Sequence, residues 1–275
     1  MDIYTAGNIY KQKCRSVRLH KAFHNQPSGI KNILDNAEIK PHKIRYYCEK
    51  RDPDFDKKMH DVLVVYKQIE LQFDEEGEIL PFEGVKINTI SYDEKPGIQA
   101  IAATAPDKMP TTEKGCRTKG SRCRDHEYVR LGTLSLLAGI DLLTGEAMPL
   151  LSETHKSSDF IEFLRMLDAK YPKGEIIRLI LDNHSAHTSK ETNKYLASNA
   201  GRFEFVFTTT HGSWLNMIES FFSKITRQML RGIRVSSKQE LAERIYQYFD
   251  EINEDPVVFR WKYKMDEMSS IKLAC

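Results

Sequence analysis

The spacing of hydrophobic residues along this chain follows two different periods. A period of three to four residues predicts amphipathic helices, whereas alternation, or a short apolar run between turn residues, predicts strands. These patterns predict helices at residues 55–71, 158–170, 189–198, 214–231 and 237–253. They predict strands at residues 85–93, 128–140, 147–151, 175–182 and 203–208, with the second and third joined as a hairpin.

The order of these elements indicates the fold class. A block of antiparallel strands comes first, a helix follows, and strands then alternate with helices, which predicts a mixed sheet flanked by helices in an α/β domain. The strand at 175–182 is almost continuously apolar and is expected at the buried centre. We expect three parts: a basic N-terminal arm over 1–50, a linker helix and turn over 51–84, and the sheet domain over 85–275.

Composition excludes several classes of protein. The 275 residues are 40% hydrophobic and 29% charged, as in globular proteins and unlike disordered or fibrous ones. No apolar run approaches the roughly 20 residues of a membrane span, and the N-terminus lacks the apolar centre of a signal peptide. The five cysteines are scattered and do not suggest a disulfide framework. We therefore expect a cytoplasmic protein with no membrane partner.

The net charge of +2 conceals two basic segments. The first 50 residues carry ten Lys and Arg against four Asp and Glu, and residues 114–130 form a second basic group. Such clusters can neutralise DNA phosphates, although a solvated surface is the ordinary explanation for either one alone. The candidate DNA contacts among these side chains are Lys43, Arg45, Arg117, Lys119, Arg122 and Arg124.

Three acidic residues stand beside strongly apolar sequence. Asp93 and Asp182 are expected at the ends of strands, and Glu219 lies within a predicted helix between apolar neighbours. A carboxylate in such surroundings is costly unless it is paired or binds a metal. Two strand ends and a helix can meet over the carboxyl edge of an α/β sheet, where sites of such folds usually lie. Three hard oxygen donors suit Mg²⁺ or Mn²⁺.

Each of these residues also has a structural interpretation. Asp93 could belong to a turn, Asp182 could cap the following helix, and Glu219 could pair with a basic residue of its own helix. Taken singly the structural interpretations lead, but as a set in this order the metal site is favoured.

Several neighbouring residues are secondary candidates. Glu94 is expected to be structural, because adjacent residues of a strand face opposite sides of the sheet. His187 either orients ligands and contacts substrate or caps a helix, two alternatives of equal weight. Trp214 and Asn216 precede Glu219 and are candidate DNA contacts, with core packing the favoured role of Trp214.

Four segments resemble a known family: SYDEKPGIQAI, DHEYVRLGTLSLLAGIDLLTGE, LILDNHSAHTSK and TTTHGSWLNMIESFFSKITRQ. In this order they resemble DDE transposases of the mariner-like superfamily, in the bacterial insertion-sequence branch numbered six-thirty. The resemblance covers about residues 30–265 and implies an RNase H-like fold. It places the family's catalytic and metal-binding triad on Asp93, Asp182 and Glu219, holding two Mg²⁺ or Mn²⁺ ions.

The resemblance also implies an activity, partners and a location. The activity is phosphoryl transfer, in which a DNA strand is cleaved at an insertion-sequence end and its 3′-hydroxyl is joined to target DNA. The implied partners are double-stranded DNA and a second copy of the chain, at the nucleoid of a bacterial cytoplasm. Two alternatives stay open: a non-catalytic DNA-binding remnant that inhibits full-length transposase, and an RNase H-like nuclease without strand transfer.

The N-terminal region departs from this family pattern. Residues 32–50 resemble only the end of the helix-turn-helix region with which such transposases begin. We therefore expect a shortened copy whose DNA binding is strongly salt-dependent and poorly selective for transposon ends.

Overall fold

The chain divides into two compact units, Met1–Glu49 and Lys50–Cys275. The computed structural model describes residue 36 and residues 52–81, 84–114, 119–210 and 212–262. Three of the candidate DNA contacts, Lys43, Arg45 and Arg117, therefore lie outside the described residues. Every strand formed by the described residues belongs to the larger unit.

A five-stranded mixed sheet, with strand order β3-β2-β1-β4-β5, forms the centre of the larger unit. The strands are β1 (Ile87–Ala103), β2 (Tyr128–Asp141), β3 (Ala147–Ser152), β4 (Ile176–Leu181) and β5 (Phe203–Phe207). The pairs β1–β2 and β2–β3 are antiparallel, whereas β1–β4 and β4–β5 are parallel. The sheet thus changes direction at β1, which confirms the mixed sheet expected from the order of elements.

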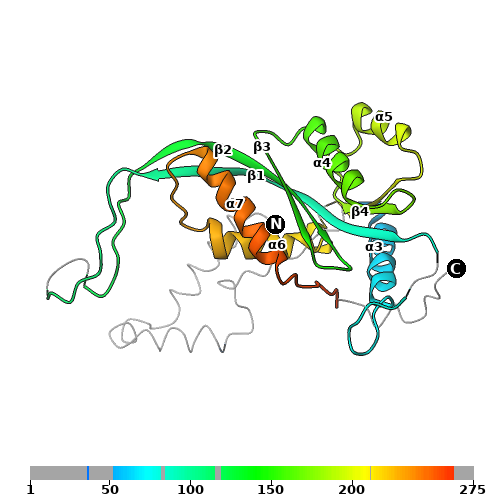
Figure 1. Ribbon diagram of the computed structural model, residues 1–275, viewed down its shortest axis with the longest axis horizontal. Helices are drawn as coiled ribbons and strands as arrows, with labels where there is room; N and C mark the ends of the chain where they lie inside the picture. Colours follow the sequence, from blue (N-terminus) through cyan, green and yellow to red (C-terminus); the bar gives the residue numbers. More distant parts are fainter. Residues whose placement is uncertain (1–35, 37–51, 82–83, 115–118, 211, 263–275) are drawn as a thin grey trace, which may run out of the picture. The chain divides into compact units, whose positions relative to one another are not determined.

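Helices cover both faces of this sheet (Figure 1). One face carries α4 (Ser157–Lys170) and α5 (Lys190–Ser198), and the other carries α3 (Phe55–Glu70), α6 (Ile218–Ile225) and α7 (Lys238–Asn253). The region predicted as a linker contributes α3, whose buried side chains join the core of this unit. In the part of the chain that is described, no helix is long and apolar enough to cross a lipid bilayer.

Each face of the sheet buries its own apolar cluster, because side chains alternate along a strand. Ile90 and Tyr92 of β1 pack with Leu181 of β4 in the cluster beneath α4. Ile180 of β4 instead belongs to the cluster beneath α3, α6 and α7. The same alternation directs Ser91 and Asp93 of β1 toward this second face.

The strand β1 is longer than the predicted strand at 85–93, and this corrects the position of Asp93. The sequence suggested a turn at residues 95–97. Instead, pairing with β2 passes from Lys95 directly to Ile98, which makes a bulge. Pro96 has no N–H to pair, and Gly97 adopts a φ of +70° that favours glycine. Asp93 therefore lies within β1 and not at its end.

Beyond the bulge, β1 and β2 continue as a two-stranded ribbon. The strand β4 pairs only with residues 87–91 of β1, and β3 pairs only with residues 135–140 of β2. The ribbon therefore extends past the rest of the sheet, as Figure 1 shows.

The single helix predicted over 214–231 is broken in the structure. It consists of a 3₁₀ turn at Ser213–Leu215, the α-helix α6, and a π-helical turn at Thr226–Leu230. The first break falls at Asn216, whose backbone is extended, with φ −93° and ψ 113°. The chain changes direction there, and Glu219 then lies in the first turn of α6.

Candidate active site

The parallel pairing of β1 with β4 brings Asp93 and Asp182 to the same level. The last paired residues are Ser91 and Ile180, and the two aspartates follow two positions later on each chain. Neighbouring strands lie about 4.8 Å apart, and residues two apart in a strand face the same side. The Asp93 carboxylate is therefore directed to the face that α6 covers, and Asp182 follows directly after the end of β4 at the same level of the sheet.

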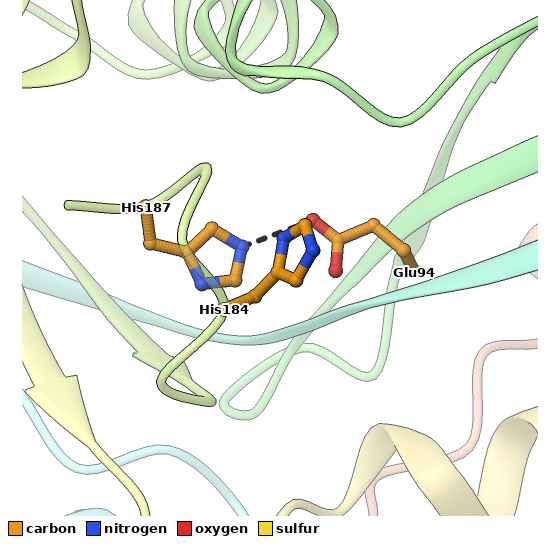
Figure 2. Close-up of side chains that lie close together, drawn as sticks. All are labelled: Glu94, His184 and His187. Carbon is orange, nitrogen blue, oxygen red and sulfur yellow. Dashed lines mark hydrogen bonds and ion pairs between the residues drawn. The ribbon is translucent and has the colours of Figure 1, made fainter. Parts of the chain in front are cut away.

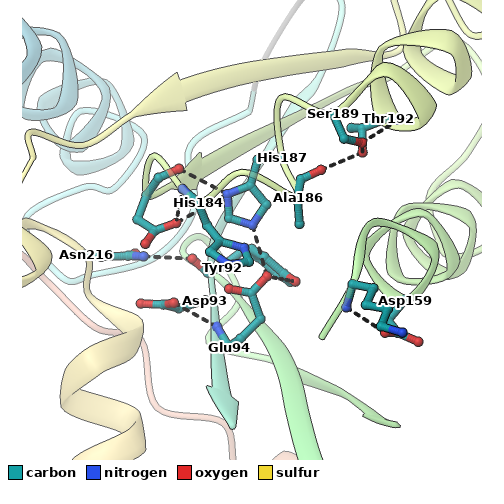
Figure 3. A network of polar contacts seen from close by, with 12 residues as sticks. Tyr92, Asp93, Glu94, Asp159, His184, Ala186, His187, Ser189, Thr192 and Asn216 are labelled. Carbon is teal, nitrogen blue, oxygen red and sulfur yellow. Dashed lines mark hydrogen bonds and ion pairs between the residues drawn. The ribbon is translucent and has the colours of Figure 1, made fainter. Parts of the chain in front are cut away.

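A buried polar clamp attaches the start of α6 to β1. The hydroxyl of Ser91 donates to Oδ1 of Asn216 over 2.5 Å and accepts from the backbone N–H of Ile218 over 2.9 Å. The amide of Asn216 donates to the carbonyl of Tyr92 over 2.7 Å, as Figure 3 shows. The clamp lies two residues before Asp93 on β1 and next to Glu219 on α6. It holds the third carboxylate over the same part of the sheet.

Electrostatic repulsion supports the proximity of these three carboxylates. Burial is the main cause that raises the pKa of Asp93, and a hydrogen bond from the N–H of Glu94, over 2.8 Å to Oδ1, opposes it. The negative charges of Glu94, Asp182 and Glu219 add to the effect of burial, and together they raise this pKa to about 7. A divalent cation would relieve this repulsion, and carboxylate oxygens are the ligands that Mg²⁺ and Mn²⁺ prefer. The chemistry of the three side chains therefore suits a divalent cation, although their ligand atoms are not among those that lie within 4.8 Å of one another in the described structure.

The carboxylates also keep oxygens available for a cation. Among the described residues, the hydrogen bonds to the side chains of Asp93 and Asp182 all go to Oδ1, which leaves Oδ2 of each without a partner. The carboxylate of Glu219 has no hydrogen-bond partner among the residues that the structure describes.

A second layer of polar side chains lies behind Asp182. Glu94 does face the opposite side of the sheet from Asp93, as expected, but it is connected to the site through His187. Its Oε1 accepts the Tyr92 hydroxyl at 2.7 Å and lies 2.9 Å from Nε2 of His187. Nδ1 of His187 is 3.0 Å from the carbonyl oxygen of Asp182 and 3.3 Å from its Oδ1. Figure 3 shows this network.

These contacts shift the pKa values of both partners. Burial by itself lowers the pKa of His187, but the hydrogen bonds to Asp182 and Glu94 outweigh it and raise the value to about 9. Burial tends to raise the pKa of Asp182, but the hydrogen bonds from His187 and from the backbone of His184 outweigh it and lower the value. A positive His187 and a negative Asp182 thus stabilise one another.

The structure also reveals a group of possible metal ligands that sequence analysis missed. Glu94, His184 and His187 each offer one ligand atom, and these atoms lie within 4.8 Å of one another (Figure 2). Nδ1 of His184 is buried without a hydrogen-bond partner among the described residues. The three-residue spacing of the two histidines was the only signal in the sequence. Because Nε2 of His187 already contacts Glu94, a metal bound here would have to replace that hydrogen bond.

Two predicted DNA contacts are buried. His187 is 1% exposed and Asn216 is 2% exposed, so neither side chain is presented to a bound duplex. His187 does not cap α5 either, because the Ser189 side chain accepts the N–H of Thr192 in that role. Both residues act inside the protein, where they connect elements of the site.

The remaining predicted contacts that are described lie at the surface. Trp214 is 43% exposed and stacks on Trp261, with ring centroids 6.1 Å apart, so it does not pack in the core as favoured from sequence. Lys119 and Arg122 are exposed in the segment that joins β1 to β2. Arg122 forms an ion pair with Asp107, with 3.8 Å between Nη1 and Oδ2. Arg124 is also exposed, and its guanidinium bonds to Asp107 and to the carbonyl of Gly232.

A sequence profile identifies the family. The profile of the DDE superfamily endonucleases matches residues 103–242, half of the chain. The chain belongs to the DDE superfamily endonucleases. The matched segment contains Asp182 and Glu219 and begins ten residues after Asp93.

A curated relative and two solved structures are also similar to this DDE endonuclease. The uncharacterized 39 kDa protein of insertion element IS630 from Shigella sonnei is 26% identical over 113 residues, 41% of this chain and 33% of that protein. The chain thus matches about a third of this relative's length. The Mos1 mariner paired end complex with Mn has 14% identity and a TM-score of 0.51, over 84% of this chain and 65% of that one. The Mos1 strand transfer complex has 14% identity and a TM-score of 0.53, over 91% and 70%. These likenesses show a shared RNase H-like fold.

Proposed function

We propose that this DDE endonuclease is a transposase that cleaves DNA at the ends of an insertion sequence and joins the freed strand to target DNA. The observation that carries the proposal is that Asp93, Asp182 and Glu219 lie near enough for their charges to interact, at the point where β4 ends and α6 is attached to β1. The relative from an insertion element and the likeness to Mos1 complexes with transposon ends support it.

The proposed reaction requires divalent cations, because a phosphodiester is already anionic and bare carboxylates would repel it. Asp93, Asp182 and Glu219 would hold two Mg²⁺ or Mn²⁺ ions. When bound, such a pair stabilises the attacking and leaving oxygens of an in-line displacement. The chain itself contributes orientation: the two aspartates each keep Oδ2 available, and the clamp between Ser91 and Asn216 holds α6 with Glu219 against β1.

The proposed partners are double-stranded DNA and a second copy of this chain. Lys119 and Arg122 are exposed at the end of the β1–β2 ribbon, where they can contact phosphates without reading sequence. The larger unit, from residue 50 onward, is proposed to carry the catalytic activity, with residues 1–49 as an additional DNA-binding arm.

The test is a cleavage and joining assay with purified full-length protein. The substrate is a labelled duplex taken from the DNA that flanks the gene, mixed with a supercoiled target plasmid in Mg²⁺ or Mn²⁺. We expect nicked end DNA and labelled plasmid with the wild type, and neither product with Asp182→Asn, which removes one charge and nearly conserves shape. DNA binding by this variant is retained or strengthened, since fewer negative charges face the phosphates.

Asp250→Asn is the matched control, because Asp250 is exposed on α7 and distant from the three carboxylates in the sequence. It should cleave and join as the wild type does. Equal nicking by the wild type and Asp182→Asn would reject the site. Cleavage without joining would identify a nuclease instead of a transposase.

A further inference from the structure

The second layer behind Asp182 has a geometry that suggests a specific task. Asp182 follows the last residue of β4, so no strand pairing fixes its orientation. Its carboxylate is instead held by two donors that both approach Oδ1: the backbone N–H of His184 at 2.9 Å and Nδ1 of His187 at 3.3 Å. Both contacts are on one oxygen, which leaves Oδ2 for another ligand.

The ring of His187 is itself held in place from several sides. Its side chain is 0% exposed, and its centroid lies 4.6 Å from that of Phe160 and 5.6 Å from that of Tyr92. Its far nitrogen, Nε2, contacts Glu94, whose side chain is only 8% exposed and also accepts the Tyr92 hydroxyl. A histidine packed between aromatic rings and bonded at both nitrogens has little rotational freedom.

The hydrogen-bond pattern also defines which atoms carry protons. Nδ1 faces a backbone carbonyl, which can only accept, so this nitrogen is a donor. Oε1 of Glu94 already accepts the Tyr92 hydroxyl, so Nε2 of His187 is the donor to that oxygen. The Nδ1–H of His187 is therefore shared between the carbonyl oxygen of Asp182 at 3.0 Å and its Oδ1 at 3.3 Å, and Nε2–H donates to Glu94 at 2.9 Å. Hydrogen bonds to carboxylates are the stronger kind.

We propose that His187 and Glu94 are positioning residues, which orient the Asp182 carboxylate so that Oδ2 meets the divalent cation of the proposed site. This inference rests on the proposed function. Hydrogen-bonded partners behind a metal ligand commonly contribute about 10- to 100-fold in metal affinity or activity. Glu94 lies on β1, 93 residues away in sequence from His187, so this contact connects β1 to the loop that follows β4.

Simple electrostatics predicts the opposite effect. Replacing His187 by Ala removes no negative charge, so by charge alone a cation would bind at least as tightly as to the wild type. Loss of orientation instead weakens cation binding. The sign of the change in Mn²⁺ affinity therefore separates a positioning role from a purely electrostatic one.

The experiment measures Mn²⁺ binding to the full-length protein without DNA, by the loss of the free Mn²⁺ signal in electron paramagnetic resonance. We expect His187→Ala and Glu94→Ala to raise the dissociation constant about 10-fold or more. Glu94→Gln keeps an oxygen that accepts a hydrogen bond from His187. Its dissociation constant for Mn²⁺ should therefore stay within about 3-fold of the wild-type value. DNA cleavage rates at limiting Mn²⁺ should follow the same order.

Two further histidine variants are controls. His155→Ala removes an exposed histidine that contacts no carboxylate in the described structure, and it should bind Mn²⁺ as the wild type does. His184→Ala keeps the backbone donor to Asp182 and should also bind normally. If it loses as much affinity as His187→Ala, then Glu94, His184 and His187 bind a cation themselves, and the positioning role is overturned.

The outcomes separate this inference from the proposed function. If the wild type cleaves DNA and the variants of His187 and Glu94 bind Mn²⁺ at least as tightly as it does, the positioning role alone is overturned. A wild type that binds no Mn²⁺ would overturn both proposals. Unfolding in urea checks that each variant is folded, and if His187→Ala is not, the contrast between Glu94→Ala and Glu94→Gln decides the question.

Discussion

Burial, together with the repulsion by neighbouring carboxylates, makes Asp93 a site where a single substitution should stabilise the protein. Asp93→Asn removes one negative charge and keeps an oxygen that can accept the N–H of Glu94. The pKa of Asp93 rises from its ordinary value of 3.8 to about 7, which means that the folded protein disfavours the charged form. The neutral amide avoids that cost.

The magnitude can be worked from the size of this shift. One pKa unit corresponds to about 1.4 kcal/mol, so the shift of Asp93 sets an upper bound of about 4 kcal/mol. Asp93 is only half-buried, and water screens part of the repulsion. We therefore expect Asp93→Asn to raise the free energy of unfolding by about 2 kcal/mol at pH 8 without divalent cations.

The pH dependence has a defined sign. Between pH 3.8 and about 7 the folded wild type binds a proton at Asp93 that the unfolded chain has lost. The contribution of Asp93 to the stability of the wild type therefore falls as the pH rises through this range and is constant above it. The advantage of Asp93→Asn should be full at pH 8, shrink below about pH 7 and nearly vanish near pH 4.

A bound cation should make the wild type more stable than Asp93→Asn. A ligand at a hundred times its dissociation constant stabilises a folded protein by about 2.7 kcal/mol, and Asp93→Asn lacks one of the proposed ligands. The assay is urea unfolding followed by circular dichroism, at pH 8 and near pH 4 with EDTA, and at pH 8 with saturating Mn²⁺. Asp250→Asn, an exposed change on α7, should alter stability by less than about 0.5 kcal/mol. A variant no more stable than the wild type in EDTA at pH 8 would refute the reasoning.

Two other substitutions test the supports of the site. Asn216→Ala leaves the Ser91 hydroxyl and the Tyr92 carbonyl without their partner, so we expect a loss of about 2 kcal/mol in urea unfolding and slower cleavage. If Asn216→Ala is as stable as the wild type, the proposed role of the clamp is contradicted. For the ribbon, replacing Lys119 and Arg122 together by Ala should weaken binding to all duplexes alike and reduce the slope of log K against log salt by about 2. An unchanged slope would show that these side chains do not contact phosphates.

The sequence by itself determined most of the helices and strands and selected the candidate residues of the site. Periodicity is a local property, so α3, α4, α5 and α7 and the strands β2 to β5 were predicted close to their observed bounds, whereas β1 extends well beyond its predicted end at residue 93. The mixed sheet followed from the order of those elements. Asp93, Asp182 and Glu219 were selected because carboxylates beside apolar sequence need a partner, and the structure brings them near enough for their charges to interact.

Only the tertiary structure decided what connects these residues. Pro96 and Gly97 have the composition of a turn, and the pairing of β1 with β2 makes them a bulge instead. Asn216 was a candidate DNA contact, and its burial against β1 makes it part of a clamp instead. Glu94 and His187 meet because β1 and β4 are neighbours in the sheet. Such contacts join residues distant in sequence, and local patterns do not contain the pairing that creates them.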